Sequence, residues 1–322
     1  MGAGAGGAPP GPTGRNDESR SGRDYHSRVR HSARARTSRP WHRRADGGDG
    51  GPDDVRHSAP ARTSRPWCRW GPVVALLLLV APAAAGAQTE FHYQYGKFVN
   101  PFSGQHAFAS VLTVQQASRW SLGDSFYFID FTDDGGADGF NEKSYYGEWY
   151  PTLSLGRVSK RTIGAGPIRD VAIVSGFNFG SDANIFRYVP GGRLSWNVPG
   201  FFFLNTDFGA AIDKGRGIAG GGAPRTDTSF VFDVNWGAGF DVGSHSFLFT
   251  GHTKFMGATT NELGHAVKAS LLAQPQFGWD LGKALTGHAN QLFLGVEYQY
   301  WWNKLGVDDG DNVAQLWVMW RM

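Results

Sequence analysis

The sequence predicts an all-β protein, a transmembrane antiparallel up-and-down β-barrel of about 12 strands between residues 88 and 322. Three observations lead to this prediction. Apolar and polar residues alternate with a period of two, in runs of about ten residues. The number of runs is even, and no stretch of this region has sustained helical periodicity. A tilted strand needs roughly 9–11 residues to cross a bilayer, so the runs have the required length.

Clusters of Gly, Asp, Asn and Pro separate the runs and mark the expected turns. In the run 228–239, for example, Phe230 and Phe232 fall on one face, and Asp233 and Asn235 fall on the other. An even number of strands returns both ends of the chain to the same side of the membrane. The expected strands are 90–98, 107–119, 123–132, 143–156, 168–180, 191–198, 201–212, 228–239, 245–256, 266–281, 291–303 and 313–322.

The segment before the barrel resembles an export signal. Residues 73–80 form a short apolar core that follows Arg65 and Arg69, and the small residues 85–87 come after it. This order predicts a signal peptide over 65–87 that is cleaved before Gln88, with a membrane anchor as the alternative. The core is too short to span a bilayer as a helix.

Residues 1–64 are rich in Arg, Gly, Pro and Ser, and we expect a disordered basic leader or a start site placed too early. The formal net charge of +3 hides a division of the chain. Residues 1–87 carry 14 Arg against 7 acidic residues, whereas residues 88–322 carry 17 basic and 21 acidic residues. The basic character belongs to the leader, so we expect no nucleic-acid partner for the barrel.

The polar face of the runs is the expected wall of a lumen. Aromatic residues share this face in places, so flat rings lie beside hydrogen-bonding groups. Such a lumen suits a polar ligand that also has a ring face. The alternative is a filled, closed barrel in which these groups satisfy one another, and the sequence leaves both interpretations open. The candidate ligand-contacting residues are Phe126, Phe128, Asp130, Glu148, Arg193, Phe201, Phe203, Asp207, Asp233, Lys254, Lys268, Asp280 and Glu297.

Tyr and Trp gather near the strand ends, for example over 145–150 and 298–302. Amphipathic rings favour the level of lipid headgroups, so these clusters indicate two interfacial girdles. Ordinary aromatic packing in a secreted soluble β-sandwich is the alternative. The last run carries Leu316, Val318 and Trp320 on one apolar face.

Catalytic motifs are missing from the sequence, and we expect neither an enzyme nor a cofactor or metal. The single cysteine, Cys68, lies in the leader, so the barrel has no disulfide or thiolate metal site. The acidic runs 133–139 and 308–311 contain oxygen ligands that calcium favours, but they do not match EF-hand spacing and favour turns. His252 shares the parity of Lys254 and is expected to be a polar wall residue.

Four segments of the chain resemble the nucleoside-specific outer-membrane channel family (Tsx-like): Tyr146–Gly156, Asp138–Asn141, Trp279–Lys283 and Glu297–Trp301. The resemblance covers the region after residue 87. It implies a monomeric twelve-stranded barrel in the bacterial outer membrane and passive uptake of nucleosides or similar small solutes. It also implies contact with outer-membrane lipid, lipopolysaccharide and the barrel-assembly machinery. No family ligand contact is transferred to a residue of this chain.

The alternative function is a closed structural, adhesive or phage-receptor barrel in the outer membrane that transports nothing.

Overall fold

The computed structural model describes residues 87–140 and 142–322. The leader expected over 1–64 and all but the last residue of the expected signal peptide lie outside these residues. In the described part of the chain, no helix has the length and apolar character needed to cross a membrane.

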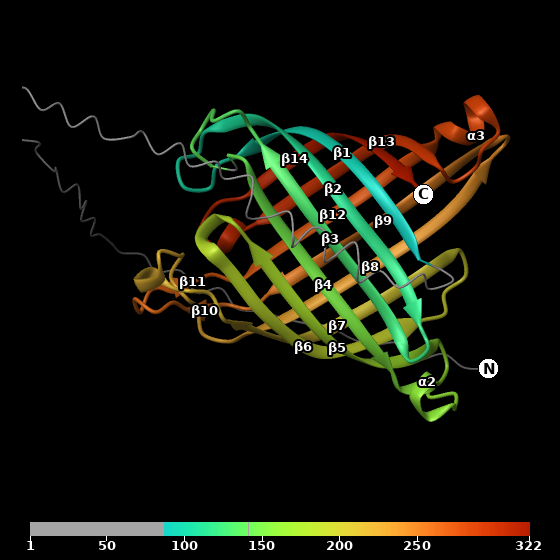
Figure 1. The fold of residues 1–322 in the computed structure, drawn as a ribbon, viewed down its shortest axis with the longest axis horizontal. Coiled ribbons are helices and arrows are strands. Elements are labelled where there is room, and N and C mark those ends of the chain that lie inside the picture. The colour runs from blue at the N-terminus through green and yellow to red at the C-terminus, as the bar shows by residue number, and fades with distance from the viewer. Residues whose placement is uncertain (1–86, 141) are drawn as a thin grey trace, which may run out of the picture. The chain divides into compact units, whose positions relative to one another are not determined.

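Twelve antiparallel strands form a closed barrel, as predicted (Figure 1). Each strand pairs with its neighbours in the chain, and the first strand pairs with the last. The strands are β1 (Gln88–Val99), β2 (His106–Trp120), β3 (Gly123–Asp133), β4 (Ser144–Ser154), β5 (Ile168–Gly180), β6 (Ile185–Trp196), β7 (Phe201–Asp213), β8 (Ser229–Val242), β9 (His245–Met256), β12 (Ser270–Asp280), β13 (Leu292–Trp302) and β14 (Asp311–Arg321).

Short elements occupy the connections between strands. A two-stranded hairpin of β10 (Thr259–Thr260) and β11 (Ala266–Val267) lies between β9 and β12. The helices α2 (Leu155–Ser159) and α3 (Leu281–Thr286) follow β4 and β12. Single 3₁₀ turns are η2 (Asp182–Asn184), η3 (Ile218–Gly220) and η4 (Lys304–Gly306).

Every expected run coincides with a barrel strand, but several sets of bounds were wrong; the strand expected at 266–281, for example, begins only at Ser270. The strand expected at 191–198 spans 185–196, because its pairing with β5 continues to Gly180 and Ile185. The run 143–156 ends at Ser154, whose hydroxyl accepts a hydrogen bond from the backbone nitrogen of Arg157 at 3.1 Å. This N-cap starts α2 and stops the strand.

The two ends of the barrel differ. Glu90 pairs with Arg321 in the β1–β14 ladder, so both ends of the described chain lie at one end, here called the terminal end. Figure 1 shows α2 and α3 at the terminal end and the β10–β11 hairpin at the opposite end, here called the loop end. The loop end carries the connections 100–105, 134–143, 181–184, 214–228, 257–269 and 303–310.

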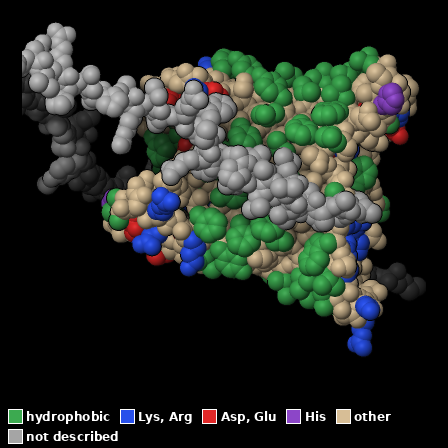
Figure 2. Space-filling view, in the orientation of Figure 1, with side chains coloured by type: hydrophobic (Ala, Val, Ile, Leu, Met, Phe, Trp, Pro, Cys, Tyr) green, Lys and Arg blue, Asp and Glu red, His purple; other side chains and the backbone are tan. Residues whose placement is uncertain are grey.

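The outer face of the barrel is apolar over most of its height (Figure 2). Because side chains alternate along each strand, the exposed apolar residues fall on the outside and the polar ones inside. Soluble monomers rarely expose such a continuous apolar surface. Exposed outward residues include Tyr93, Leu112, Phe131, Ile173, Phe208, Phe230, Val296 and Leu316.

The seam between β1 and β14 is only partly a backbone ladder. Paired residues run from Glu90 and Arg321 to Tyr95 and Leu316, about half the length of β1. Towards the loop end, side chains replace the ladder. Lys304 Nζ donates to the carbonyl oxygen of Val99 at 2.9 Å and to Asp311 at 2.6 Å. Both charged side chains are almost fully buried.

Charged side chains also fasten the terminal end of this seam. Arg321 Nε donates to Glu90 Oε1 at 2.7 Å, inside the barrel mouth. We expect Arg321→Gln to lower the free energy of unfolding by about 1.5 kcal/mol, because a hydrogen bond between charged groups is lost. Urea titration of the heat-modifiable band in SDS gels measures this loss. Arg119→Gln at the same end is the control, since its exposed 3.5 Å pair with Asp124 contributes little. Equal losses in both variants would contradict the prediction.

Candidate functional site

A buried ion pair crosses the lumen from β4 to β9. Four strands separate these two in one direction around the barrel and six in the other, so Glu148 and Lys254 face each other from nearly opposite walls. Lys254 Nζ donates to Glu148 Oε1 at 2.7 Å and also reaches the second carboxylate oxygen. The side chains are only 10% and 6% exposed. This pair, here called the crossbar, joins two nearly opposite walls of the lumen.

Neighbouring polar groups hold the crossbar in place. Tyr146 donates its hydroxyl hydrogen to Glu148 at 2.6 Å, and Asn178 Nδ2 donates to the same carboxylate at 2.9 Å. The ammonium of Lys254 lies 5.3 Å from the centre of the Tyr150 ring. The carboxylate and the ammonium therefore both have several partners, as a buried charge requires.

Glu297 on β13 is held by neutral amides. Its carboxylate accepts hydrogen bonds from Gln94 at 3.3 Å, Gln274 at 3.1 Å, Gln276 at 2.7 Å and Gln315 at 3.1 Å. No Lys or Arg in the described residues pairs with Glu297. The charge of this carboxylate is therefore stabilised by dipoles alone, in a wall built by four strands.

A second charged group of the lumen runs over β6 to β9. Arg193 holds Asp207 through two bonds of 2.6 Å, the bidentate arrangement that a guanidinium favours. Asn235 bridges Asp207 to Asp233 at 3.4 and 3.1 Å. His252 Nδ1 lies 2.8 Å from Asp233, so the histidine is a bonded wall residue of the lumen.

Three aromatic rings form a surface beside the crossbar. Phe126 and Phe128 on β3 lie on the lumen face, with ring centres 6.3 Å apart, and Tyr146 lies 6.2 Å from Phe128. Asp130 follows on the same face and accepts a hydrogen bond from the hydroxyl of Thr113. This aromatic shelf (Phe126, Phe128 and Tyr146) places flat rings next to two carboxylates, those of Asp130 and Glu148.

An apolar cluster fills the lumen nearer the terminal end. Leu248, Phe293, Trp317 and Met319 pack together, and Trp317 has no exposed surface. This group is here called the apolar plug. Trp317 Nε1 also donates to His92 Nδ1 at 3.0 Å.

Glycines make room for the tryptophan. A Cβ atom added at Gly278 would lie 2.5 Å from the ring of Trp317, and one added at Gly295 would lie 1.9 Å from the carbonyl oxygen of Phe277. Close packing at these two positions therefore requires glycine.

Ten of the sequence-predicted site residues face the lumen between the two ends, namely Phe126, Phe128, Asp130, Glu148, Arg193, Phe203, Asp207, Asp233, Lys254 and Glu297. Asp280 shares this parity, but both its oxygens cap backbone nitrogens, those of Lys283 at 2.8 Å and Asn290 at 2.6 Å. Its observed contacts belong to the start of α3 and to the connection that follows this helix.

Two of the expected lumen positions were wrong. A β-bulge between Phe201 and Phe203 shifts the register, so Phe203 lies opposite Gly237 whereas Phe201 lies opposite Ala238. Adjacent residues of β8 point to opposite faces, which removes Phe201 from the lumen face. Lys268 lies before β12 in a loop-end connection, where its half-exposed ammonium pairs with Asp308 at 2.8 Å.

Several lumen residues escaped the sequence-based selection. Gln94, Gln315 and Asn178 are neutral, so a search for charged and aromatic groups passed over them. Trp317 was not predicted as a lumen residue, because the apolar residues of β14 were expected on its outward face. The alternation of faces along β1 and β14 would have placed Gln94, Gln315 and Trp317 on the lumen side.

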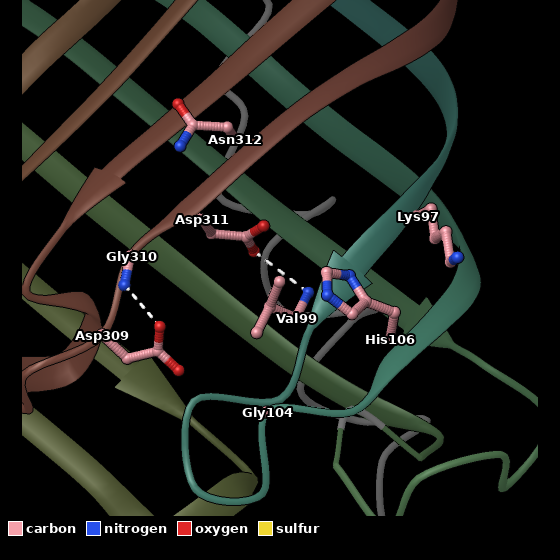
Figure 3. Close-up of a pocket in the computed structure, with 8 residues that line it drawn as sticks. All are labelled: Lys97, Val99, Gly104, His106, Asp309, Gly310, Asp311 and Asn312. Carbon is pink, nitrogen blue, oxygen red and sulfur yellow. Dashed lines mark hydrogen bonds between the residues drawn. The ribbon is translucent and has the colours of Figure 1, made fainter.

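A separate cavity of about 330 Å³ lies at the loop end, lined by residues at the ends of β1, β2 and β14 (Figure 3). Each of its two carboxylates accepts hydrogen bonds, although the buried Oδ1 of Asp311 has no partner in the described residues. Asp311 accepts from the backbone nitrogen of Val99 at 3.4 Å, and Asp309 accepts from Gly310 at 2.8 Å. The cavity belongs to the seam rather than to the lumen.

The acidic loop residues form turns. Asp133, Asp134 and Asp138 each accept a backbone hydrogen bond from a residue two positions later. Within residues 87–140 and 142–322, no group of three or more His, Cys, Asp or Glu side chains is arranged to hold a metal ion.

The fold and the site define a class of structure: a closed antiparallel barrel with an apolar outer face and a bonded polar lumen. No protein-family model matches the chain, and no curated protein does. Among solved structures it is similar to the KdgM porin, with a TM-score of 0.38, 8% identity and coverage of 72% of this chain and 98% of the porin.

It is also similar to an outer-membrane channel from Pseudomonas putida F1, with a TM-score of 0.42 and 9% identity. The match covers 75% of this chain and 96% of the channel. A third similar structure is the translocator domain of the autotransporter NalP from Neisseria meningitidis. Its TM-score is 0.33 and its identity 12%, and the match covers 78% of this chain and 94% of the domain.

Proposed function

We propose that this protein is an outer-membrane channel for the passive passage of small polar solutes, nucleosides among them. The observation that carries the proposal is the aromatic shelf beside the carboxylates of Asp130 and Glu148. A nucleoside combines a flat base with hydroxyl donors, which matches rings next to acceptors. Bases stack on aromatic side chains without regard to sequence.

The membrane location rests on the outer face of the barrel. A closed barrel satisfies its backbone polar groups internally, so it can lie in hydrocarbon. The exposed apolar side chains then contact lipid instead of water. In this arrangement the terminal end faces the periplasm and the loop end faces outward.

The lumen carboxylates are hydrogen-bonded by neutral donors, which the polar groups of a passing solute can replace. Four glutamine amides bond Glu297, and a threonine hydroxyl bonds Asp130. Hydroxyl or amide groups of a passing solute can replace these donors one at a time, so no charged group loses all its partners. Movement through the lumen also requires the crossbar to open.

The crossbar is the observation that favours the alternative, a closed structural, adhesive or phage-receptor barrel. Both of its charges are buried and fully partnered. A permanently closed crossbar would leave the lumen without a path.

Planar-bilayer recordings separate the two functions. The protein purified from outer membranes is first checked for heat-modifiable mobility, which a soluble sandwich lacks. A channel gives small single-channel currents that nucleosides reduce. Currents that ignore nucleosides would remove that substrate class, and the absence of any current would support the closed barrel. N-terminal sequencing of the same material should begin at Gln88.

We expect Phe128→Ala to weaken nucleoside block about tenfold, since stacking contributes roughly 1–3 kcal/mol per base. Phe131→Ala is the matched control, because Phe131 is on the same strand but faces outward. The measurement is the nucleoside concentration that halves the current. Equal block in wild type and Phe128→Ala would show that the shelf does not bind the base.

The other expected partners remain predictions of the same proposal. We expect a monomer that contacts outer-membrane lipid and lipopolysaccharide and is inserted by the barrel-assembly machinery.

A further inference from the structure

One side of the terminal end carries a dense group of cations. Arg119 is the second-last residue of β2, and Arg169 is the second residue of β5. The other three cations, Arg157, Lys160 and Arg161, lie on and just after α2. Figure 2 shows Lys and Arg side chains gathered around the position of α2. These five residues are here called the basic collar.

Hydrogen bonds hold the backbone of α2 and of the connection after it, which carry most of the collar cations. The guanidinium of Arg157 donates to the carbonyl oxygens of Trp120 at 3.2 Å and of Gly123. Arg161 donates its backbone N–H to Gly156 at 3.1 Å. A Cβ atom at Gly164 would lie 2.0 Å from the carbonyl oxygen of Ile168, so the two arms of the connection pack closely. The cations are therefore presented from a fixed backbone.

Three collar cations have no counter-ion. Lys160, Arg161 and Arg169 are exposed, and none pairs with a carboxylate in the described residues. The two nearby carboxylates are already engaged. Asp124 pairs with Arg119 and Arg157, and Asp170 accepts from Ser154 and from the backbone of Gly156. The collar thus has an excess of three positive charges over its own acids.

Exposed apolar residues lie among these cations. Trp120 and Leu122 flank the β2–β3 turn, and Val158 and Ile163 lie in the α2 connection. All four are at least 40% exposed. Apolar side chains beside Lys and Arg, at the rim of an apolar barrel wall, match the boundary between acyl chains and headgroups.

We propose that the basic collar binds the phosphate of an anionic glycerophospholipid, such as phosphatidylglycerol, in the periplasmic leaflet. This inference rests on the membrane location given under Proposed function, but it does not need the lumen to conduct. The cations supply the charge for the phosphodiester, and Trp120 and Leu122 contact the first acyl carbons. The site lies on one side of the barrel, so the bound lipid forms no continuous ring.

Native mass spectrometry of the detergent-purified protein tests the site. Phosphatidylglycerol and phosphatidylcholine with identical acyl chains are added separately. Each Lys or Arg beside an anionic lipid raises affinity about fivefold at low salt. The wild type should retain phosphatidylglycerol at a concentration at least about fivefold below that needed for phosphatidylcholine. This preference should decline in high salt, which screens exposed charges.

The variant Lys160→Gln, Arg161→Gln, Arg169→Gln should lose the preference. The matched control Lys97→Gln, Lys214→Gln, Arg216→Gln removes three exposed cations near the loop end and should keep it. Heat-modifiable mobility of both variants verifies folding, and Arg161→Gln alone should give an intermediate preference.

Three results would overturn the inference: no preference in the wild type, equal loss in the control variant, or complete displacement of the lipid by soluble glycerol phosphate. Complete displacement would show that the collar binds a free phosphate group and not a lipid. Bilayer currents are recorded on the same preparations. A wild type that lacks the lipid preference but shows nucleoside block refutes only the lipid site, and a wild type that keeps the preference but gives no current refutes only the channel.

Discussion

Lys254→Met should destabilise the folded barrel by about 3–5 kcal/mol, because it leaves Glu148 as a buried charge without its cation. It should also raise the single-channel conductance, since the crossbar no longer joins the two walls. Stability is read from urea titration of the heat-modifiable band, and conductance from planar bilayers.

The double variant Glu148→Gln, Lys254→Met separates these two effects. The introduced glutamine side chain would keep Tyr146 and Asn178 as partners while no charge remains at the crossbar, so most of the stability should return. The raised conductance should persist. Lys268→Met is the control for removing a lysine, because the exposed ion pair of Lys268 with Asp308 contributes at most about 1 kcal/mol. Unchanged stability in Lys254→Met would show that water reaches the carboxylate.

Trp317→Ala should cost about 3–5 kcal/mol of stability through the cavity it leaves in the apolar plug. It should also widen the lumen near the terminal end, so larger solutes should pass in liposome-swelling assays. Both effects follow from the complete burial of this side chain among Leu248, Phe293 and Met319.

The variant Trp317→Phe separates the contribution of packing to stability from the contribution of the hydrogen bond to His92. Phenylalanine keeps most of the contacts but leaves His92 Nδ1 without its donor, which should cost about 1–3 kcal/mol. Leu316→Ala is the matched control, since the neighbouring Leu316 faces outward and is half exposed. If Leu316→Ala destabilises the barrel as much as Trp317→Ala, the plug has no special role.

The strands could be read from the sequence because a barrel wall imposes a strict period of two. Phe230 and Asp233 fall on opposite faces in the sequence pattern and in the structure. The same rule failed at Phe201, where the bulge adds one residue to β7 and reverses the parity beyond it. A bulge leaves no mark in the alternation of a Phe-Phe-Phe run.

Contacts across the lumen could not be read from the sequence. The lumen positions of Glu148 and Lys254 follow from parity, but their pairing depends on barrel diameter and on the stagger of twelve strands. Lys268 had the right parity but lies outside the strand, because β12 begins only at Ser270. Strand ends are set by turns and caps, and these are the least regular part of the sequence pattern.

The seam described above also sets the order in which the barrel is completed. Each other pair of neighbouring barrel strands is joined by a connection of at most 15 residues, whereas Glu90 and Arg321 are 231 residues apart. Entropy delays contacts between distant chain segments, so hairpins form early and the first strand waits for the last. Until then β1 has a free edge that can pair with another chain. The pairing of β14 thus determines when that edge is protected from aggregation.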